Sequence, residues 1–107
     1  MLLHPETQAA LQSAKNLVHT VDEMLERIDG IRARRPSANS RVIPEVDGMG
    51  RLTDLYLAPG TIAGSASREE LVSEIVGAIQ ECTVDAARQH RIVTQTTAWP
   101  EVPWPPQ

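Results

Sequence analysis

Residues 46–60 read VDGMGRLTDLYLAPG, and this stretch decides the fold class. Its Asp47-Gly48-Met49-Gly50 segment has the capacity for positive φ angles that a tight hairpin turn requires. An extended run from Val42 to Val46 precedes the turn, and Arg51 to Leu57 returns as a second strand until Pro59-Gly60 ends it. The stretch therefore predicts an antiparallel β-hairpin.

Two irregularities are expected in this hairpin. Pro44 cannot donate a hydrogen bond to a ladder, so its strand should lie at a sheet edge or carry a bulge. Leu55 and Leu57 lie on one face of the second strand, but Leu52 breaks their alternation, which indicates a bulge near the turn. A two-stranded hairpin alone is marginal in water, so we expect helices to cover it and a second copy to extend it edge to edge.

The segment before the hairpin has the pattern of one long helix that begins near Pro5 and is closed by Pro36. Apolar residues recur at alternating spacings of three and four, and a second apolar column repeats every seven residues. The two sets are Leu11, Ala14, Val18, Val21, Leu25 and Ile28, and Leu17, Met24 and Ile31. This broad face would pack on the chain's own second helix or form a coiled-coil-like contact with another copy.

A second helix follows the hairpin and begins with a capping box, Ser67-Arg68-Glu69-Glu70. Its apolar stripe comprises Leu71, Ile75, Ile79, Cys82 and Ala86, and the pattern fades after Val93. The sequence thus predicts an α+β fold: a long N-terminal helix, a small antiparallel sheet of two to three strands, a C-terminal helix, and a dimer joined through the sheet.

Length and composition bound the class of protein. The 107 residues suit one domain, which we place at residues 1–93, with a Trp/Pro-rich tail at residues 94–107. The net charge of −4 argues against a strong, salt-driven grip on nucleic acid or an anionic membrane. The single cysteine excludes an intramolecular disulfide and favours a reducing compartment. Because no apolar stretch approaches roughly 20 residues and the start lacks a signal-peptide pattern, we expect a soluble, cytoplasmic protein.

The tail reads TQTTAWPEVPWPPQ, and the four prolines in its last eight residues favour extended polyproline II structure. Trp99 and Trp104 are expected to bind a groove on a partner protein. Alternatively, the tail folds back over the apolar stripe of its own dimer. The remaining alternative is a disordered end.

The order of the segments resembles the YbaB/EbfC family of small bacterial nucleoid-associated proteins. The residues that carry the resemblance are Val46–Leu52, Leu55–Pro59 and the helix Glu69–Gln89, within a match over roughly residues 5–93. Where the family typically shows Asn-Gly-x-Gly, this chain has Asp47-Gly48-Met49-Gly50. The first family strand is barely visible in residues 36–41, and the Trp-Pro tail is not part of the family pattern.

The resemblance implies an α–β–β–β–α subunit that dimerises through its sheet, projects paired helices like tweezers and binds DNA with modest sequence preference. The expected dimer interface comprises Val42, Val46, Leu52, Leu55 and Leu57. The family also includes divergent relatives that look like accessory proteins of type VII (ESX) secretion in actinobacteria. The alternative function is therefore a protein-binding adaptor or chaperone-like accessory that uses helical grooves and the Trp-Pro tail.

Arginines are the candidate DNA contacts: Arg32, Arg34, Arg35 and Arg41 about the end of the first helix, with Arg88 and Arg91 on the second. Duplicated in a dimer, they could contact several phosphates and give a salt-dependent affinity. The alternative is that they are solvated cations matched to the helix dipole. No aromatic residues interleave with them, so binding would be led by the DNA backbone and weakly selective.

Nothing in the sequence has the spacing of a catalytic or metal site, so we expect a non-enzymatic protein without a metal or other cofactor. The three histidines, His4, His19 and His90, have no second His or Cys at ligand spacing. Cys82 falls on the apolar stripe beside Glu81 and Asp85, which would raise its pKa. We interpret Cys82 as a small buried side chain and not as a nucleophile.

Overall fold

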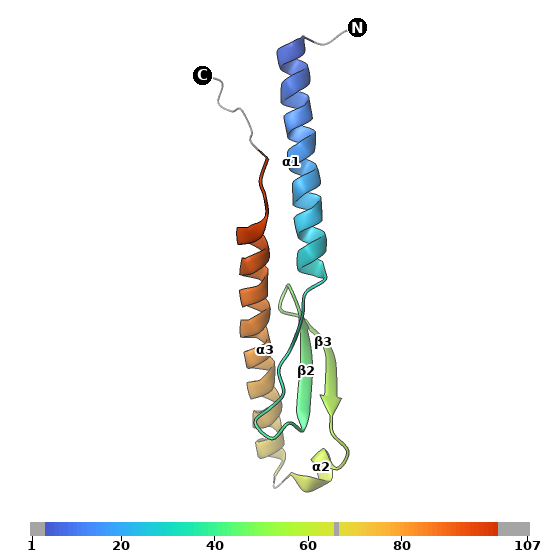
Figure 1. Cartoon of the computed structure of the whole chain (residues 1–107). Coiled ribbons are helices and arrows are strands. Elements are labelled where there is room, and N and C mark those ends of the chain that lie inside the picture. Colours follow the sequence, from blue (N-terminus) through green and yellow to red (C-terminus); the bar gives the residue numbers. More distant parts are fainter. Residues whose placement is uncertain (1–3, 66, 101–107) are drawn as a thin grey trace.

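The computed structural model describes residues 4–65 and 67–100. Within them, the elements are α1 (Pro5–Asp29), β1 (Arg32–Arg34), β2 (Val42–Asp47), β3 (Leu52–Leu57), α2 (Thr61–Gly64) and α3 (Arg68–Thr96). The strands form one antiparallel sheet in the order β1-β2-β3 (Figure 1). The predicted α+β fold is confirmed, with a sheet of three strands in the described part of the chain.

The predicted hairpin is formed by β2 and β3, and Asp47 organises its turn. The Asp47 Oδ1 atom accepts hydrogen bonds from the backbone N–H groups of Met49 and Arg51, each at 2.9 Å. Its Oδ2 atom accepts a third from the Arg51 guanidinium at 2.8 Å. Gly50 completes the turn with a φ of +81°, a conformation that residues with a side chain rarely adopt.

The bulge expected near Leu52 is confirmed. Glu45 pairs with Asp54, whereas the next residue, Val46, pairs with Leu52, so Thr53 is the extra residue of β3. The Thr53 hydroxyl donates to the Glu45 carboxylate at 2.7 Å, which gives the bulged residue a polar partner. The bulge also changes which β3 side chains share a face near the turn.

The first strand lies where the sequence predicted helix. We expected the first helix to extend to Pro36, but α1 ends at Asp29 and Arg32–Arg34 pair with Glu45–Asp47 as β1. Gly30 follows the last helical residue and weakens any continuation of the helix. The strand also buries Ala33 completely against α3, which a further helical turn would not do. These two effects outweigh the favourable placement of arginines at a helix end.

Pro44 lies in the central strand, so of the two arrangements expected for its strand, an edge position or a bulge, the edge position is excluded. The pairing of β2 with β3 is irregular between Glu45 and Val46, directly after Pro44. β1 is short, and it pairs only with Glu45, Val46 and Asp47 of β2. The pairing therefore does not reach Pro44. The missing N–H therefore removes no bond between β1 and β2. Pro44 instead contributes to the buried face of β2 together with Val42 and Val46.

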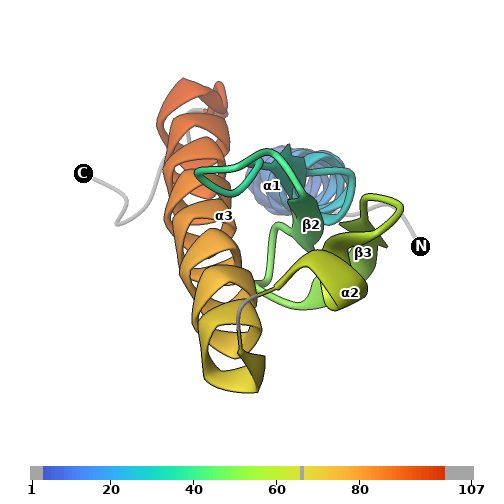
Figure 2. The same cartoon turned by 90° about the horizontal axis from the view of Figure 1, so that it is seen from below.

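The core is small and lies between α3 and the first two strands. Ala33, Val46, Cys82 and Ala86 form its buried cluster. Figure 2 shows β3 on the far side of β2 from α3. Consequently α3 covers β1 and β2, whereas every residue of β3 except the half-buried Leu57 is exposed in the part of the chain that the structure describes.

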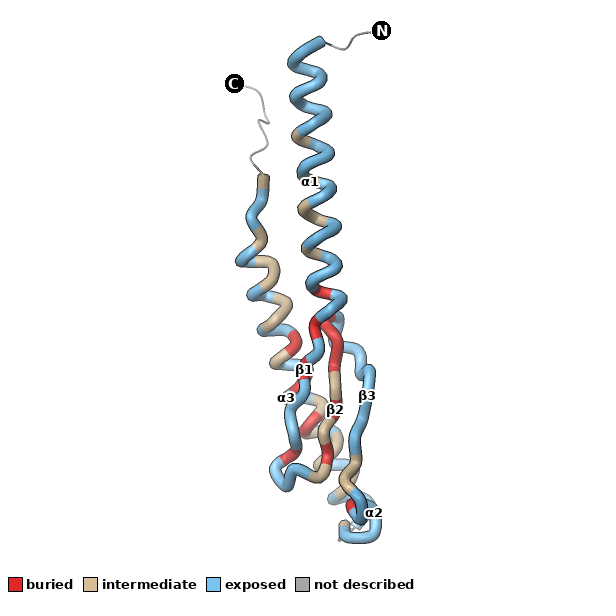
Figure 3. The backbone as a smooth tube through the Cα atoms, turned by 45° about the vertical axis from the view of Figure 1, so that its right-hand side comes forward, coloured by how far each residue is buried: buried red, intermediate tan, exposed pale blue. Residues whose placement is uncertain are grey.

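The protomer is elongated, with extents of 74 × 26 × 17 Å and a radius of gyration of 22.0 Å. A compact chain of this length would have a radius of gyration of about 13 Å. The difference arises because α1 projects beyond the sheet and buries a single residue, Ile28 (Figure 3). The other long helix, α3, starts at the predicted cap, where the Ser67 hydroxyl accepts the Glu70 N–H at 3.0 Å, and continues past Val93 to Thr96.

Candidate functional site

The hairpin turn lies at the junction of both long helices. Gly48 contacts the last turn of α1, where a Cβ at residue 48 would stand 2.2 Å from the Ile28 carbonyl oxygen. On the other side, the Nδ1 atom of His90 in α3 lies 3.0 Å from the Gly48 carbonyl oxygen. The turn therefore fixes the direction in which α1 leaves the sheet.

The structure does not bring the six candidate arginines onto one surface. Arg34 lies on the face of β1 opposite the buried Ala33, and its Nε atom donates to the Glu45 carboxylate at 2.8 Å. Arg41 lies in the connection before β2 and donates to the Glu74 carboxylate of α3 at 2.7 Å. Each of these guanidinium groups thus already has a carboxylate partner.

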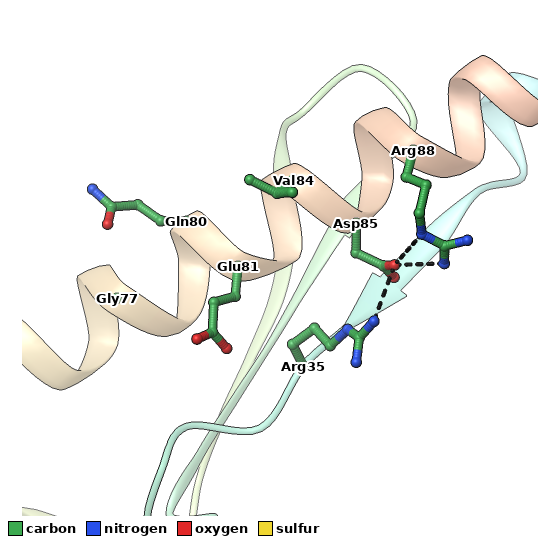
Figure 4. Close-up of a pocket in the computed structure, with 7 residues that line it drawn as sticks. All are labelled: Arg35, Gly77, Gln80, Glu81, Val84, Asp85 and Arg88. Atoms are coloured by element: carbon green, nitrogen blue, oxygen red, sulfur yellow. Dashed lines mark hydrogen bonds and ion pairs between the residues drawn. The ribbon is translucent and has the colours of Figure 1, made fainter.

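Arg35 and Arg88 share one carboxylate. Asp85 Oδ1 accepts from Arg88 at 2.7 Å and from Arg35 at 3.3 Å, so it joins α3 to the segment after β1 (Figure 4). Both arginines are about half exposed, whereas the Asp85 side chain is 11% exposed. This carboxylate is therefore a fixed structural charge between two cations.

Arg32 and Arg91 differ from the other four. Arg32 donates to the carbonyl groups of Asp29 and Ile31, each at 2.7 Å, and so satisfies backbone acceptors at the end of α1. Arg91 is exposed on α3. Among the residues that the structure describes, no carboxylate forms an ion pair with Arg32 or Arg91.

Hydrogen bonds keep the paired carboxylates ionised. The Arg88 guanidinium lowers the pKa of Asp85, and the Arg41 guanidinium lowers that of Glu74, in both cases against the opposing effect of burial. The pKa of Glu45 is lowered first by the Thr53 hydroxyl and then by Arg34. Because these negative charges persist at neutral pH, the positive potential around the arginines is weaker than their number suggests.

A shallow groove of about 630 Å³ runs along α3 beside Arg35. Figure 4 shows Glu81, Asp85 and Arg88 on the helix and Arg35 on the neighbouring segment. Gly77 leaves one end of the groove without a side chain. The groove presents both signs of charge, which is suited to a polypeptide with mixed charges more than to a polyanion.

The predicted interface residues fall into two groups. Val42 and Val46 are 0% exposed and pack beneath α3, so they cannot contact a second copy in this conformation. On β3, Leu52 is 48% and Leu55 37% exposed, and Leu57 is half-buried. An interface along the sheet would therefore use β3.

Cys82 is buried, as predicted. Its Sγ atom accepts the Arg35 N–H at 3.1 Å and donates to the Pro44 carbonyl at 3.4 Å, so it joins α3 to the segment directly after β1 and to β2. Burial raises the pKa of the thiol, and Asp85 and Glu81 add to this effect. In the tail, Trp99 is 50% exposed, and Trp104 lies outside the described residues.

Three further observations bear on function. Within residues 4–65 and 67–100, no three or more His, Cys, Asp or Glu residues lie close enough together to hold a metal ion. No helix in that part of the chain is long and apolar enough to cross a bilayer. No model of a known protein family matches the chain, and no curated protein matches it.

Proposed function

We propose that the chain is a non-enzymatic homodimer that binds duplex DNA weakly and with little sequence selectivity in the bacterial cytoplasm. The observation that carries this proposal is the α–β–β–β–α arrangement with a long α1 projecting from the sheet. Apart from the four-residue α2, it is the subunit architecture that the resemblance to the YbaB/EbfC family implies, although the first strand is Arg32–Arg34 and does not lie in residues 36–41. The DNA-binding role rests on that resemblance.

The shape of the protomer supports the homodimer. β3 is an edge strand, so the outward-facing half of its N–H and C=O groups has no strand partner among the described residues. Antiparallel pairing of two β3 strands about a twofold axis would satisfy these groups and join the two sheets. The same pairing would cover Leu52 and Leu55, which α3 leaves exposed. The expected interface is therefore narrower than the five residues named from the sequence.

The arrangement of the arginines supports weak DNA binding only. Arg32 and Arg34 share the outer face of β1, and Arg91 lies on the exposed side of α3. A twofold axis would duplicate these groups and present two to six cations to the phosphates. Since each neutralised phosphate contributes about −0.9 to the slope of log affinity against log salt, we expect a slope of roughly −2 to −5.

A protein-binding adaptor is the second candidate, and the ion pairs specifically favour it. Arg34, Arg35, Arg41 and Arg88 are partnered by carboxylates, and the groove along α3 carries both signs of charge. The net charge of −4 points the same way. A mixed-charge peptide segment, such as one from a secretion substrate, would fit this surface better than a phosphate backbone.

Electrophoretic mobility shift of duplex DNA over a series of salt concentrations tests the proposal. We expect the wild type to shift DNA at low salt, and Arg91→Ala and the Arg32/Arg34/Arg35→Ala variant to weaken the shift. Arg68→Ala is the matched control, because it removes an exposed arginine at the opposite end of α3. Absence of a shift by the wild type at low salt would exclude DNA binding and leave the adaptor.

A further inference from the structure

The projecting part of α1 carries an apolar surface that neither the core nor the proposed function uses. Figure 3 shows that most of this helix beyond the sheet is exposed. Its apolar residues recur at spacings of three and four, as do the a and d positions of a heptad repeat. They are Leu11, Ala14, Val18, Val21 and Leu25, and we call them the α1 seam. Three of them, Leu11, Val18 and Leu25, are 46%, 59% and 53% exposed. Ile28 would continue the pattern, but it is buried beside the hairpin turn, so the seam ends at Leu25.

The end of α3 contacts a different side of α1. Residues 97–98 line a small hollow of about 120 Å³ with Thr20 and Met24. The Arg27 guanidinium, on the same side of α1, donates to the Thr96 hydroxyl at 3.3 Å. At 3.6 residues per turn, this side lies roughly 130° around the helix from the middle of the α1 seam. In the part of the chain that the structure describes, the end of α3 therefore does not cover the exposed members of the seam.

The other flank of the seam has a hollow and two charges. The hollow, of about 330 Å³, is lined by Ala14, Lys15, Val18, His19 and Asp22. Because the side chain of Ala14 is small, a larger apolar side chain from a facing helix fits there as a knob in a hole. Lys15 and Asp22 occupy the e positions of successive heptads and are exposed, and neither forms an ion pair among the described residues. The seam and this flank therefore suit a second amphipathic helix whose charges lie in complementary positions.

A second copy of α1 meets this requirement when the two helices run antiparallel. In an antiparallel pair of identical helices, the e positions of one helix face the e positions of the other, whereas in a parallel pair they face g positions. The g positions of α1 are the apolar Leu17 and Met24. A parallel pair would therefore give neither charge an opposite charge. An antiparallel pair places Lys15 of each copy opposite Asp22 of the other.

The same two charges select one register of the antiparallel pair. A shift by one heptad in either direction places Lys15 opposite Lys15 or Asp22 opposite Asp22, and like charges repel. The register that pairs Lys15 with Asp22 also sets Ala14 opposite Leu25 of the second copy. The smallest member of the seam thus faces a large one, which allows the two helices to interdigitate.

We propose that α1 binds α1 of a second copy as an antiparallel twofold pair, through the α1 seam and two Lys15–Asp22 ion pairs. This interface is separate from β3 and goes beyond the proposed dimer. Because the seam covers fewer heptads than a stable coiled coil usually has, we expect it to form at a higher protein concentration than the pairing of β3. A chain with two different twofold interfaces then joins β3 dimers into tetramers or longer assemblies.

Charge reversal with rescue tests this proposal, with self-association measured by sedimentation equilibrium at low salt. The background is full-length Leu55→Lys, which weakens the pairing of β3, and we expect a monomer–dimer equilibrium at high concentration. Lys15→Asp or Asp22→Lys brings like charges together twice per pair and should raise the dissociation constant about tenfold. The double variant Lys15→Asp/Asp22→Lys restores opposite charges and should return the constant to its starting value. Glu23→Lys is the matched control, because it makes the same charge change on the opposite side of α1 and should have no effect.

The salt dependence gives a second measurement. Added salt should weaken the pair in the Leu55→Lys background and strengthen it in the two single reversals, because salt screens attraction in the first case and repulsion in the others. Circular dichroism at the same concentrations checks that each variant keeps its helices.

Three results would overturn the proposal: a Leu55→Lys protein that is monomeric up to about 1 mM, single reversals without effect, or a double variant as weak as the single ones. The second result would mean that any pair of α1 helices is parallel or in another register. A dimeric wild type together with a Leu55→Lys protein that is monomeric throughout would exclude the α1 pair and retain the β3 dimer, so the two interfaces are tested separately.

Discussion

Gly48 of the hairpin turn and Ile28 of α1 are in direct backbone contact, since a Cβ on Gly48 would lie 2.2 Å from the Ile28 carbonyl oxygen. This contact joins two segments whose signals are separate in the sequence, the Asp-Gly-x-Gly turn and the end of the first helix. The two glycines of the turn serve different purposes. Gly50 has a positive φ with open space around it, whereas Gly48 allows close approach of the helix.

We therefore expect Gly48→Ala to reduce the free energy of unfolding by about 2–3 kcal/mol, because the added methyl group forces the backbone of the turn away from α1. Urea denaturation followed by circular dichroism measures this change. Gly77→Ala is the control: Gly77 is inside α3, and a Cβ added there would face open space, so the substitution should stabilise by about 0.5–1 kcal/mol. Equal effects of the two substitutions would contradict the role assigned to Gly48.

Cys82 provides a second prediction. Cys82→Ala removes the acceptor of the Arg35 N–H and should reduce the free energy of unfolding by about 1–2 kcal/mol. In the wild type, burial and the raised pKa of the thiol should make alkylation by a maleimide slow until urea unfolds the chain. Rapid modification of the folded protein would show that α3 does not stay packed on β1 and β2.

Stability should also fall in acid. The pKa values of Glu74 and Asp85 are lowered from ordinary values of 4.5 and 3.8, mainly by hydrogen bonds from Arg41 and Arg88. Below these ordinary values the unfolded chain binds protons that the folded chain does not, so stability is lost as the pH falls through the lowered values. The urea midpoint should be unchanged from about pH 7 to about pH 5 and decrease towards about pH 3. A midpoint that rises in acid would contradict the ion pairs.

Sequence reasoning identified the elements whose signals are local. The turn of Asp47 and Gly50, the bulge near Leu52 and the cap at Ser67 each depend on a few adjacent residues, and the structure contains all three. β1 was missed because its signal is not local. Arg32–Arg34 contains one small apolar residue, and it is a strand because Ala33 packs on Cys82 and Ala86 about 50 residues later. In the sequence alone, Ala33 between two arginines has the pattern expected at the C-terminal end of a helix.

The candidate site shows the same limit. Arg41 and Glu74 are 33 residues apart and Arg35 and Asp85 are 50 apart, so sequence spacing gave no sign that these arginines have carboxylate partners. Likewise, Val42 and Leu55 are both apolar residues of predicted strands. In the structure, Val42 lies beneath α3 and Leu55 lies at the open side of the sheet. What a strand residue contacts depends on which strands the helix covers, and the order of segments does not determine that.

The open side of the sheet gives the last prediction, which concerns the proposed dimer. Leu55 is 37% exposed on β3, and a twofold pairing of β3 strands would bury it twice per dimer. Leu55→Lys places two charges in that interface, so we expect the dimer dissociation constant to rise tenfold or more, since each 1.4 kcal/mol corresponds to about a factor of ten. Val84→Lys is the matched control, because Val84 is 71% exposed on α3 away from β3.

Light scattering over a dilution series should show a Leu55→Lys monomer at concentrations where the wild type and Val84→Lys are dimers. A wild type that is monomeric throughout, or a Leu55→Lys dimer as stable as the wild type, would remove β3 from the interface. In the second case the exposed apolar column of α1, Leu11, Val18 and Leu25, would be the surface to substitute next.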